Sequence, residues 1–501
     1  MKKANPAKEV YQQLRVLSCE QLWSEEVPAF DQADARGRMD RVGLIRAVGV
    51  VFSESGTTAQ KNQARQWLRA LLHDPEEKIR RYAMTALPKI GADAGEESEL
   101  LSLLEKSASD REKESLSRTL EKIGGNATLD AAAGLAARSV QKVEANVARH
   151  ENPGTVRLDR PLQNFANLRI HLHCRAGLEE ILEDELQEHM AGGAKFRLVH
   201  RQPGRLEIAP TGLVKLADVY ALRCFSAVGL VLGTGKNNLE EIAALIASPQ
   251  TSHILEAFTD GPIRYRLEFV SKGHQRAAVR RVASRVYELR PALLNDPRNA
   301  PWQINIIEIP PGCSVELTPR LRPDPRFAYR QDDVPAASHP PLAAAMARLA
   351  GGMENETIWD PFCGSGLELI ERTLRGGVQR VFGSDRSPEA IAITRENFAA
   401  AVKNPPEATF LCGDFRSLAD LKDLSLIITN PPMGRRVPIP DLPGLIADLF
   451  VAAASALRPG GRLVFANPLP VEPRGSSLKR EFRRKVDLGG FHVNLEKYLK
   501  Q

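Results

Sequence analysis

One stretch of sequence decides how the C-terminal part of the chain is expected to fold: residues 424–434, which read Leu-Ser-Leu-Ile-Ile-Thr-Asn-Pro-Pro-Met-Gly. The first six residues form a mostly apolar run of the length of a buried β-strand. Asn430, Pro431 and Pro432 end that run, because proline cannot donate to the hydrogen-bond ladder of a central strand. The amide of Asn430 is therefore expected directly after a buried strand.

A second strand end lies upstream, in the segment Asp360-Pro361-Phe362-Cys363-Gly364-Ser365-Gly366. Its two glycines allow the backbone to approach a ligand closely where a strand turns into a helix. From residue 357 onward the pattern alternates between strand and helix, which predicts an open, doubly wound, Rossmann-like α/β sheet. Its strands are expected at residues 357–360, 380–385, 408–414, 424–429 and 462–466, with a closing strand at 491–495.

Polar side chains stand at four consecutive strand ends of this predicted sheet: Asp360, Asp385, Asp414 and Asn430. Ligands of such sheets bind beyond the carboxyl ends of the strands. Asp385 can accept both hydroxyls of a ribose, and Asp414, with Phe415 behind it, is placed to hold an adenine amino group. Each aspartate taken alone is explained equally well as a helix cap or a surface residue. The turn lacks the third glycine of a dinucleotide site, which argues against a nicotinamide cofactor.

Asn430 and Pro431 together can act on an amine. An exocyclic amine of guanine or adenine is a poor nucleophile because its lone pair is delocalised into the ring. The Asn430 side-chain oxygen and the Pro431 carbonyl can each accept one amine hydrogen, which aims the nitrogen lone pair at a sulfonium methyl group. These residues predict S-adenosylmethionine-dependent methylation of a nucleobase amine, without a metal. The alternative is an ordinary strand-ending turn, because Asn-Pro is a common breaker.

The two motifs resemble those of class I methyltransferases, in the branch with Asp-Pro-Phe-Cys-Gly-Ser-Gly and Asn-Pro-Pro-aromatic-Gly. Tyr329-Arg330 and residues 337–344 are similar to the family segment that packs beside the methionine end of the cofactor. The resemblance implies S-adenosylmethionine as cofactor, held by Asp360, Pro361, Phe362, Cys363, Gly364, Ser365, Gly366, Asp385, Arg386, Asp414, Phe415, Asn430 and Ser338. It implies catalytic roles for Asn430, Pro431, Pro432 and Met433.

Met433 departs from the family pattern, which has an aromatic residue there to stack on the target base. Stacking on an aromatic ring contributes about 1–3 kcal/mol, whereas a methionine sulfur contributes about 0.3–1.5 kcal/mol. Weaker or altered holding of the base is expected, so guanine N2 and adenine N6 both stay open as targets. Arg435 and Arg436 follow and are candidate RNA contacts, although two arginines in a loop usually contact nothing specific.

Residues 165–325 are expected to form an α+β module. The order strand, helix, strand, strand, helix between residues 168 and 221 suggests a small ferredoxin-like unit. A basic helix is predicted at residues 275–289, and a solvated helix face is the alternative explanation of its charge. Its candidate RNA contacts are Arg276, Arg280, Arg281 and Arg285.

This middle region resembles the ferredoxin-like plus THUMP pair that precedes the catalytic domain in several RNA-modifying enzymes. The matching features are the basic helix, Gly177-Leu178-Glu179-Glu180 and Leu294-Asn295-Asp296-Pro297. Together with the methyltransferase motifs, the resemblance implies an RNA guanine-N2 methyltransferase acting on tRNA or large-subunit ribosomal RNA. In that family the module grips RNA by shape and phosphate contacts rather than by reading bases.

Residues 1–150 are predicted to form an all-α domain that resembles HEAT repeats. One helix is expected to end at Asp74-Pro75, and the next repeats apolar residues at helical spacing. That apolar face comprises Ile79, Ala83, Ala86, Leu87 and Ile90. Such an arm is expected to bind a protein partner or to extend the RNA surface.

Composition sets broad limits on the class of protein. A chain of 501 residues suggests about three domains, here 1–150, 165–325 and 326–501. Hydrophobic residues make up 43% and charged residues 26%, as in soluble globular proteins, and no stretch is apolar enough to span a bilayer. The six cysteines are scattered without a Cys-x-x-Cys pair, which favours a reducing cytoplasm over a zinc site or disulfides.

Other functions compete with RNA methylation. Cytosine C5 methylation needs a cysteine beside the strand-end proline, where this chain has Asn430. Methylation of a protein amine or of DNA adenine shares the Asn-Pro-Pro motif but does not explain the middle module. A non-catalytic RNA-binding or assembly protein with a degenerate methyltransferase domain is the alternative from a different class.

Overall fold

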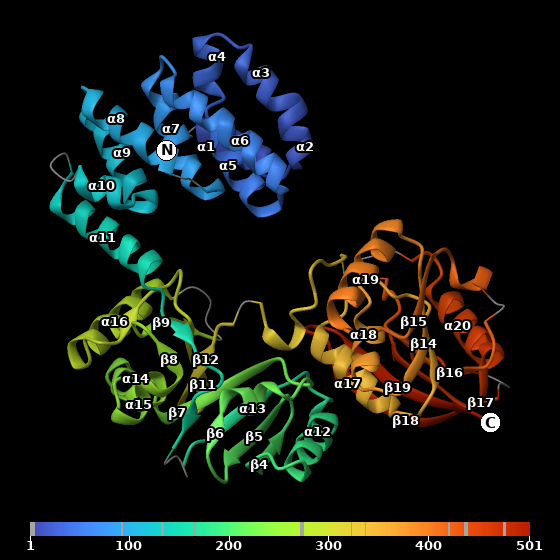
Figure 1. The fold of residues 1–501 in the computed structure, drawn as a ribbon. Helices are drawn as coiled ribbons and strands as arrows, with labels where there is room; N and C mark the ends of the chain where they lie inside the picture. Colours follow the sequence, from blue (N-terminus) through green and yellow to red (C-terminus); the bar gives the residue numbers. More distant parts are fainter. Residues whose placement is uncertain are drawn as a thin grey trace. The chain divides into compact units, whose positions relative to one another are not determined.

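The structure is a computed structural model. It describes residues 6–91, 94–131, 135–163, 167–270, 275–321, 323–335, 337–418, 421–434, 439–473 and 477–501. The chain folds into two compact units, Met1–Pro153 and Gly154–Gln501. Figure 1 colours the first unit from blue to teal and the second from teal to red.

The first unit is helical, and its described residues contain no β-strand. The helices are α1 (Pro6–Leu14), α2 (Cys19–Gln21), η1 (Leu22–Glu26), α3 (Val27–Asp31), α4 (Ala35–Asp40), α5 (Gly43–Ser55), α6 (Thr58–Ala70), η2 (Leu71–His73), α7 (Glu77–Ile90), α8 (Ala94–Lys106), α9 (Asp110–Ile123), α10 (Asn126–Asp130) and α11 (Ala137–Glu151). The predicted face of α7 is buried, except that Ile90 is half-buried. A Cβ atom on Gly49 would lie 2.8 Å from Ala86 Cβ, so small residues let α5 and α7 pack closely.

The second unit contains an eight-stranded sheet with the strand order β10-β9-β11-β12-β7-β3-β5-β4. The strands are β3 (Ile170–His173), β4 (Phe196–Gln202), β5 (Arg205–Pro210), β7 (Ala227–Lys236), β9 (Arg264–Phe269), β10 (Leu294–Asn295), β11 (Trp302–Ile309) and β12 (Gly312–Pro319). Its helices are α12 (Glu179–Ala191), α13 (Leu216–Tyr220), α14 (Leu239–Ile246), α15 (Pro249–Phe258) and α16 (Arg276–Leu289). Two short ribbons pair β1 (Thr155–Val156) with β8 (Thr259–Asp260), and β2 (Pro161–Leu162) with β6 (Val214–Lys215).

The longer elements β7, β12 and α15 of this region were not predicted from the sequence, and neither were the two-residue strands β1, β2, β6, β8 and β10. Strand β7 contains Gly229, Gly233 and Gly235, and glycine weakens the sequence signal of a strand. The second helix of the predicted ferredoxin-like unit was expected at residues 213–221. It begins only at Leu216, because Val214–Lys215 pairs with β2. Because β7 joins β3 to β12, the predicted ferredoxin-like part and the part that follows share one continuous sheet.

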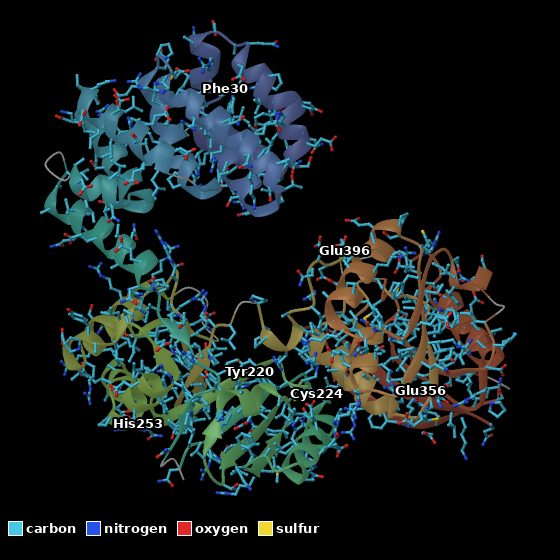
Figure 2. All side chains as sticks on the ribbon, in the orientation of Figure 1. Phe30, Tyr220, Cys224, His253, Glu356 and Glu396 are labelled. Carbon is cyan, nitrogen blue, oxygen red and sulfur yellow. The ribbon has the colours of Figure 1, made fainter. Side chains whose placement is uncertain are left out.

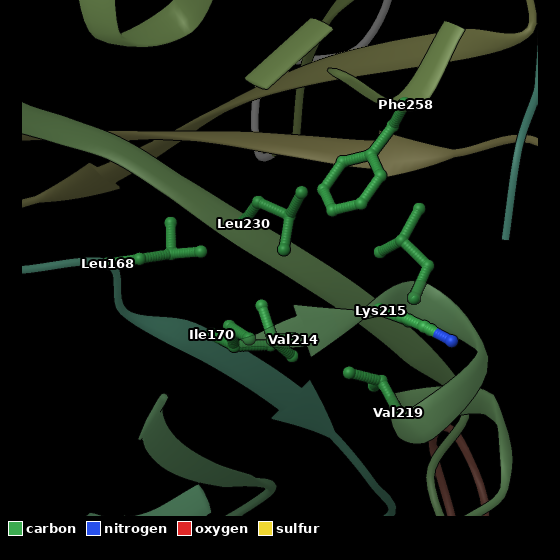
Figure 3. Close-up of a pocket in the computed structure, with 8 residues that line it drawn as sticks. Leu168, Ile170, Val214, Lys215, Val219, Leu230 and Phe258 are labelled. Atoms are coloured by element: carbon green, nitrogen blue, oxygen red, sulfur yellow. The ribbon is translucent and has the colours of Figure 1, made fainter. Parts of the chain in front are cut away.

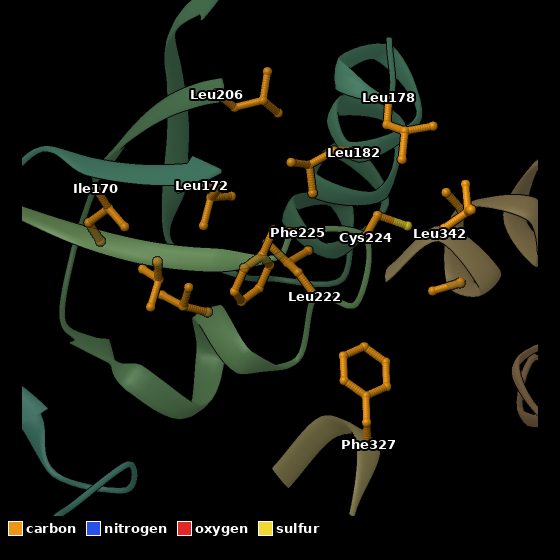
Figure 4. Packing of buried hydrophobic residues seen from close by; sticks show 14 of the residues in the cluster. Ile170, Leu172, Leu178, Leu182, Leu206, Leu222, Cys224, Phe225, Phe327 and Leu342 are labelled. Atoms are coloured by element: carbon orange, nitrogen blue, oxygen red, sulfur yellow. The ribbon is translucent and has the colours of Figure 1, made fainter. Parts of the chain in front are cut away.

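The core of this sheet is apolar and closely packed. Figure 4 shows Leu172 and Leu182 from β3 and α12 in a cluster that extends to Phe327 and Leu342 near the start of the next region. Figure 3 shows a second part of it, where Ile170, Leu230 and Phe258 border a gap too small for a water molecule. This gap is therefore core packing rather than a ligand site.

The C-terminal sheet has seven strands in the order β15-β14-β13-β16-β17-β19-β18. They are β13 (Glu356–Asp360), β14 (Val378–Asp385), β15 (Glu407–Cys412), β16 (Leu424–Thr429), β17 (Leu457–Asn467), β18 (Leu478–Asp487) and β19 (His492–Lys500). The helices around it are η4 (Pro325–Phe327), α17 (Pro340–Ala350), α18 (Leu367–Leu374), α19 (Pro388–Ala401), η5 (Phe415–Leu418) and α20 (Leu442–Ala456). The first five strands run parallel, which confirms the predicted doubly wound α/β arrangement (Figure 1).

The far edge of this sheet differs from the prediction. A basic stretch, Lys479 to Lys485, lies in the unpredicted edge strand β18, and the closing strand β19 is longer than expected. Arg480 and Arg483 of this stretch form ion pairs with Glu472, which precedes the strand. Charged side chains are typical of an exposed edge strand, because they hinder its pairing with the strands of other chains.

Charged contacts fix the helix that follows the glycine turn. Glu356 of β13, labelled in Figure 2, lies buried between Arg372 of α18 and Arg462 of β17. Glu371 of α18 accepts hydrogen bonds from Arg223 at 2.7 Å and from the Tyr329 hydroxyl at 2.5 Å. Helix α18 is therefore held from both the sheet behind it and the region before it.

Candidate active site

The two motif segments lie side by side in the structure. Strands β13 and β16 are parallel neighbours, with Trp359 opposite Ile427, so both chains leave the sheet at the same edge. The hydroxyl of Thr429 donates to Asp360 Oδ1 at 2.5 Å, which ties the two strand ends together. Asn430 therefore begins its loop directly beside the glycine turn.

The side chain of Asn430 has a defined orientation. Its Nδ2 donates to Ser338 Oγ at 2.7 Å, and the Ser338 hydroxyl in turn donates to Glu368 Oε1. Because the serine proton is used in the bond to Glu368, the serine oxygen is the acceptor towards Asn430. Asn430 Oδ1 is buried and has no hydrogen-bond partner among the described residues. This oxygen is free to accept a hydrogen bond from a ligand.

Pro431, Pro432 and Met433 continue the loop. Pro431 is buried, whereas Pro432 and Met433 are half-buried. Met433 packs against the main apolar cluster of the second unit. The next residue, Gly434, has a φ of 73°, a conformation that favours glycine.

The backbone of the glycine turn adopts conformations that favour glycine. Gly364 and Gly366 have φ values of 52° and 84°, and a Cβ atom on Gly366 would lie 3.0 Å from Thr394 Cγ2. Thr394 Oγ1 donates to the Gly364 carbonyl at 2.7 Å, and Asn397 Nδ2 donates to the Ser365 carbonyl at 3.0 Å. Sequence reasoning missed these two residues of α19, because nothing in a helical pattern indicates a contact with a distant turn.

Two buried carboxyl groups lie next to this turn. Asp360 is fully buried, and its Oδ2 has no hydrogen-bond partner among the described residues. Burial, and then the nearby Glu368, raise the pKa of Asp360 well above its usual value. Burial likewise raises the pKa of Glu368 to about 7, although the bond from Ser338 opposes that shift. The unpartnered carboxyl of Asp360 favours a positive charge nearby, because a cation would offset the cost of ionising it.

Asp385 and Asp414, two more predicted cofactor residues, each use only some of their hydrogen-bond acceptor positions within the protein. Asp385 is half-buried and accepts bonds from the amides of Gly364 at 3.1 Å and Ser387 at 2.9 Å. Asp414 forms an ion pair with Arg416 at 3.1 Å. A carboxylate has more acceptor positions than these bonds use, so both can take a further donor.

The remaining predicted side chains pack or face solvent. Phe415 is buried edge-on against Phe362, with ring centroids 4.9 Å apart. Cys363 is buried, and Arg386 is exposed. Burial raises the pKa of the Cys363 thiol, which keeps it neutral. Cys363 therefore fits the turn as a small apolar side chain.

The predicted basic helix is α16, and it borders a groove of about 1090 Å³. Arg276 and Arg280 line this groove, and Arg281 is also exposed. Arg285 instead bonds Glu240 and Glu288, each at 2.9 Å. Arg435 and Arg436 lie outside the described residues.

Among the described residues, one group of three side chains has the composition of a metal site: His171, His173 and Glu316. Glu316 Oε1 lies 2.6 Å from His171 Nδ1, and Oε2 lies 2.8 Å from His173 Nε2. Arg205 Nη1 is 3.9 Å from the same carboxylate. A Cβ atom on Gly229 would lie 2.2 Å from Glu316 Oε2, so the glycine makes room for this carboxylate. The hydrogen bonds account for the burial of the acid.

Comparisons with known proteins find likeness to methyltransferases. Residues 328–469 match the family model described as RMKL-like, methyltransferase domain. A tRNA (guanine(10)-N2)-dimethyltransferase from Methanothermobacter thermautotrophicus is 31% identical over 183 residues, which are 36% of this chain and 50% of that protein. A tRNA (guanine(6)-N2)-methyltransferase from Thermus thermophilus is 30% identical over 189 residues, which are 36% of this chain and 54% of that protein. The chain thus spans about half the length of the curated relatives it matches.

A solved structure extends the likeness in fold beyond this region. The crystal structure of TrmN from Thermus thermophilus matches 67% of this chain and 100% of its own, with a TM-score of 0.51 and 21% sequence identity. At that identity the match shows the fold alone. The sequence match and the paired strand ends fall in the same segment, so residues 328–469 are similar to an RMKL-like methyltransferase domain.

Proposed function

We propose that this protein transfers a methyl group from S-adenosylmethionine to an exocyclic amine of an RNA base, with guanine N2 of tRNA as the first candidate target. The buried Asn430 Oδ1 beside the glycine turn carries this proposal, because it is an acceptor without a partner among the described residues. The tRNA guanine-N2 activity named for the two relatives supports the choice of base and RNA. Large-subunit ribosomal RNA is the second candidate.

The site suits a cofactor with a ribose and a positive charge. Asp385 lies at the end of β14 with acceptor capacity for ribose hydroxyls, and Gly364 and Gly366 let the backbone come close. Asp360, whose Oδ2 has no partner among the described residues, favours a nearby cation by charge. S-adenosylmethionine supplies a methyl group on a sulfonium, which is already a good leaving group.

The protein's own contribution to the reaction is positioning. Asn430 Oδ1 and the Pro431 carbonyl would each accept one hydrogen of the base amine, which holds its lone pair towards the methyl group. The prolines restrict the loop backbone and so keep these acceptors in place. Met433 follows Pro432, at the position where the target base would lie. Its thioether would stabilise the base ring less strongly than an aromatic side chain would.

We also propose roles for the other predicted regions. Residues 165–325 would act as a ferredoxin-like plus THUMP module that binds RNA, with Arg276, Arg280 and Arg281 on its exposed helix. Residues 1–150 would act as a HEAT-like arm that binds a protein or extends the RNA surface. The six free cysteines are compatible with a cytoplasmic location. Within the described residues, no helix has the length and apolarity needed to cross a membrane.

The test joins cofactor binding to product identification. Calorimetry of the purified protein with S-adenosylmethionine should give saturable heat. Incubation with RNA from a strain that lacks this protein should then yield N2-methylguanosine, identified by mass spectrometry of nucleosides. Detection of N6-methyladenosine instead would identify adenine, rather than guanine, as the target base. Calorimetry without binding heat would favour the non-catalytic alternative.

A further inference from the structure

Glu368 has no part in the sequence prediction, yet it lies at the end of a hydrogen-bond chain that reaches Asn430. Glu368 is the second residue of α18, immediately after the glycine turn. It is 3% exposed and accepts the proton of the Ser338 hydroxyl. Ser338 is itself buried and accepts from Asn430 Nδ2 at 2.7 Å. Three segments distant in sequence thus meet in one directed chain.

The direction of this chain decides which atom of Asn430 is available. An amide can be turned by 180° with little change in shape, which exchanges its oxygen and its nitrogen. An oxygen can accept from a base amine, whereas an NH₂ group would meet the amine hydrogens with hydrogens of its own. A carboxylate only accepts, so an ionised Glu368 forces the serine to donate to it and leaves the serine oxygen to accept from Asn430.

We propose that Glu368 is a positioning residue, which acts through Ser338 to keep the oxygen of Asn430, rather than its nitrogen, available to the base amine. This inference rests on the proposed function of Asn430. It goes beyond that function, because it assigns the orientation of the amide to a residue that contacts neither substrate nor cofactor in the proposed reaction.

The protonation state of Glu368 would determine the orientation of the Asn430 amide. A protonated carboxyl can donate to Ser338, which then can donate to Asn430 Oδ1 and turn the amide. Burial raises the pKa of Glu368 to about 7, so this change falls in an accessible pH range. The groups that face Glu368 are Asp360 of β13, Glu371 of α18 and Tyr329 from the segment before α17.

The experiment compares three variants of the full chain with S-adenosylmethionine and total RNA. Glu368→Met removes the acceptor and should lower kcat about 10- to 100-fold, which is typical for a misplaced catalytic group, while the RNA KM and cofactor Kd change less than about threefold. Glu368→Gln resembles the protonated acid, because its side chain can donate as well as accept, and it should hold kcat near the lowered level that the wild type reaches at low pH. Glu389→Gln, an exposed acid on α19, is the matched control and should behave as wild type.

The pH profile and a double variant separate positioning from a general structural effect. The wild-type kcat should fall as the pH drops below about 7, and this fall should be absent in Glu368→Gln. Because both act in one chain, Ser338→Ala combined with Glu368→Met should be no slower than Ser338→Ala alone, within about twofold. Additive losses, or an unchanged pH profile in Glu368→Gln, would overturn the proposal.

A readout that needs no turnover keeps this inference distinct from the proposed function. Selective ¹⁵N labelling of asparagine, assigned by comparison with Asn430→Ala, reports whether the Asn430 NH₂ protons are held in a hydrogen bond. Slow exchange of these protons in wild type and fast exchange in Glu368→Met is the expected result. Equal exchange rates of the Asn430 NH₂ protons in wild type and Glu368→Met would disprove the role of Glu368, even if methyl transfer is found. If the exchange rates differ as expected but no RNA is methylated, only the proposed function is disproved.

Discussion

Two polar clusters of the second unit differ in how their buried atoms are satisfied. The cluster of His171, His173 and Glu316 lies on β3 and β12, the two strands that flank β7 in the sheet, and both carboxylate oxygens of Glu316 have an imidazole partner. The cluster of Asp360 and Asn430 lies at the ends of two parallel strands. There, Asp360 Oδ2 and Asn430 Oδ1 have no partner among the described residues.

The comparison separates a structural polar cluster from a ligand site. A buried polar atom without a hydrogen bond costs stability, so its persistence in a fold suggests a partner outside the chain. The middle of an antiparallel sheet brings side chains together with each other, whereas parallel strand ends direct them beyond the sheet. The first cluster should therefore matter for stability, and the second for binding and catalysis.

The largest expected effect is on methyl transfer by Asn430→Ala. Loss of the amide oxygen should lower kcat about 100- to 1000-fold, as for other preorganised polar groups that act only in the transition state. Calorimetry should show cofactor affinity close to that of wild type. Asn404→Ala, on an exposed loop, is the matched control. A wild-type rate in Asn430→Ala would remove the distinction between the two clusters.

Glu316→Ala should affect stability instead. Loss of this buried acid should lower the free energy of unfolding by about 3 kcal/mol at pH 7, measured by urea titration, because it breaks a buried charged cluster. Methyl transfer at low temperature should be unchanged. Glu256→Ala, an exposed acid of α15, is the control. A variant as stable as wild type would show that the cluster contributes nothing to the fold.

The stability effect of Glu316 should depend on pH in a defined direction. Burial alone would raise its pKa, but the hydrogen bonds from His171 and His173 outweigh it and lower the pKa from 4.5 to about 2. A lowered pKa in the folded state stabilises the fold above the unfolded value and loses that contribution as the pH falls towards 2. The difference between wild type and Glu316→Ala should therefore shrink between about pH 4.5 and pH 2.

Asp385→Ala sharpens the comparison within the site. Loss of charge-assisted bonds to ribose hydroxyls should cost about 1.5–3 kcal/mol, which raises the cofactor Kd about 10- to 150-fold in calorimetry. Asp414→Ala should have a smaller effect, because Arg416 already pairs with that carboxylate. The reverse order would mean that the residue bound to the ribose has been assigned wrongly.

The smallest effect is expected on RNA binding by α16. Arg280→Ala should weaken binding modestly and reduce the salt dependence by about one phosphate contact, measured by fluorescence anisotropy at several salt concentrations. Arg285→Ala is a matched control on the same helix, because Glu240 and Glu288 already neutralise this arginine. Equal effects of the two variants would argue that α16 contributes only its overall charge.

The predicted strands of the C-terminal sheet were found because buried parallel strands are continuous apolar runs with clear ends. Residues 424–429 were predicted to the residue, whereas the strand expected at 408–414 ends at Cys412. Strand β7 was missed because its glycines interrupt the apolar pattern, although one of them makes room for Glu316. Strand β18 was missed because an edge strand needs few apolar residues.

The sequence by itself determined which residues stand at the strand ends, since apolar runs, glycines and prolines are local signals. It therefore identified Asp360, Asp385 and Asn430 and the glycine turn between strand and helix. Only the tertiary structure decided which atom of Asn430 is available, because that depends on Ser338 and Glu368, which come from two other segments. Hydrogen-bond direction is a property of the assembled chain, and no spacing along the sequence encodes it.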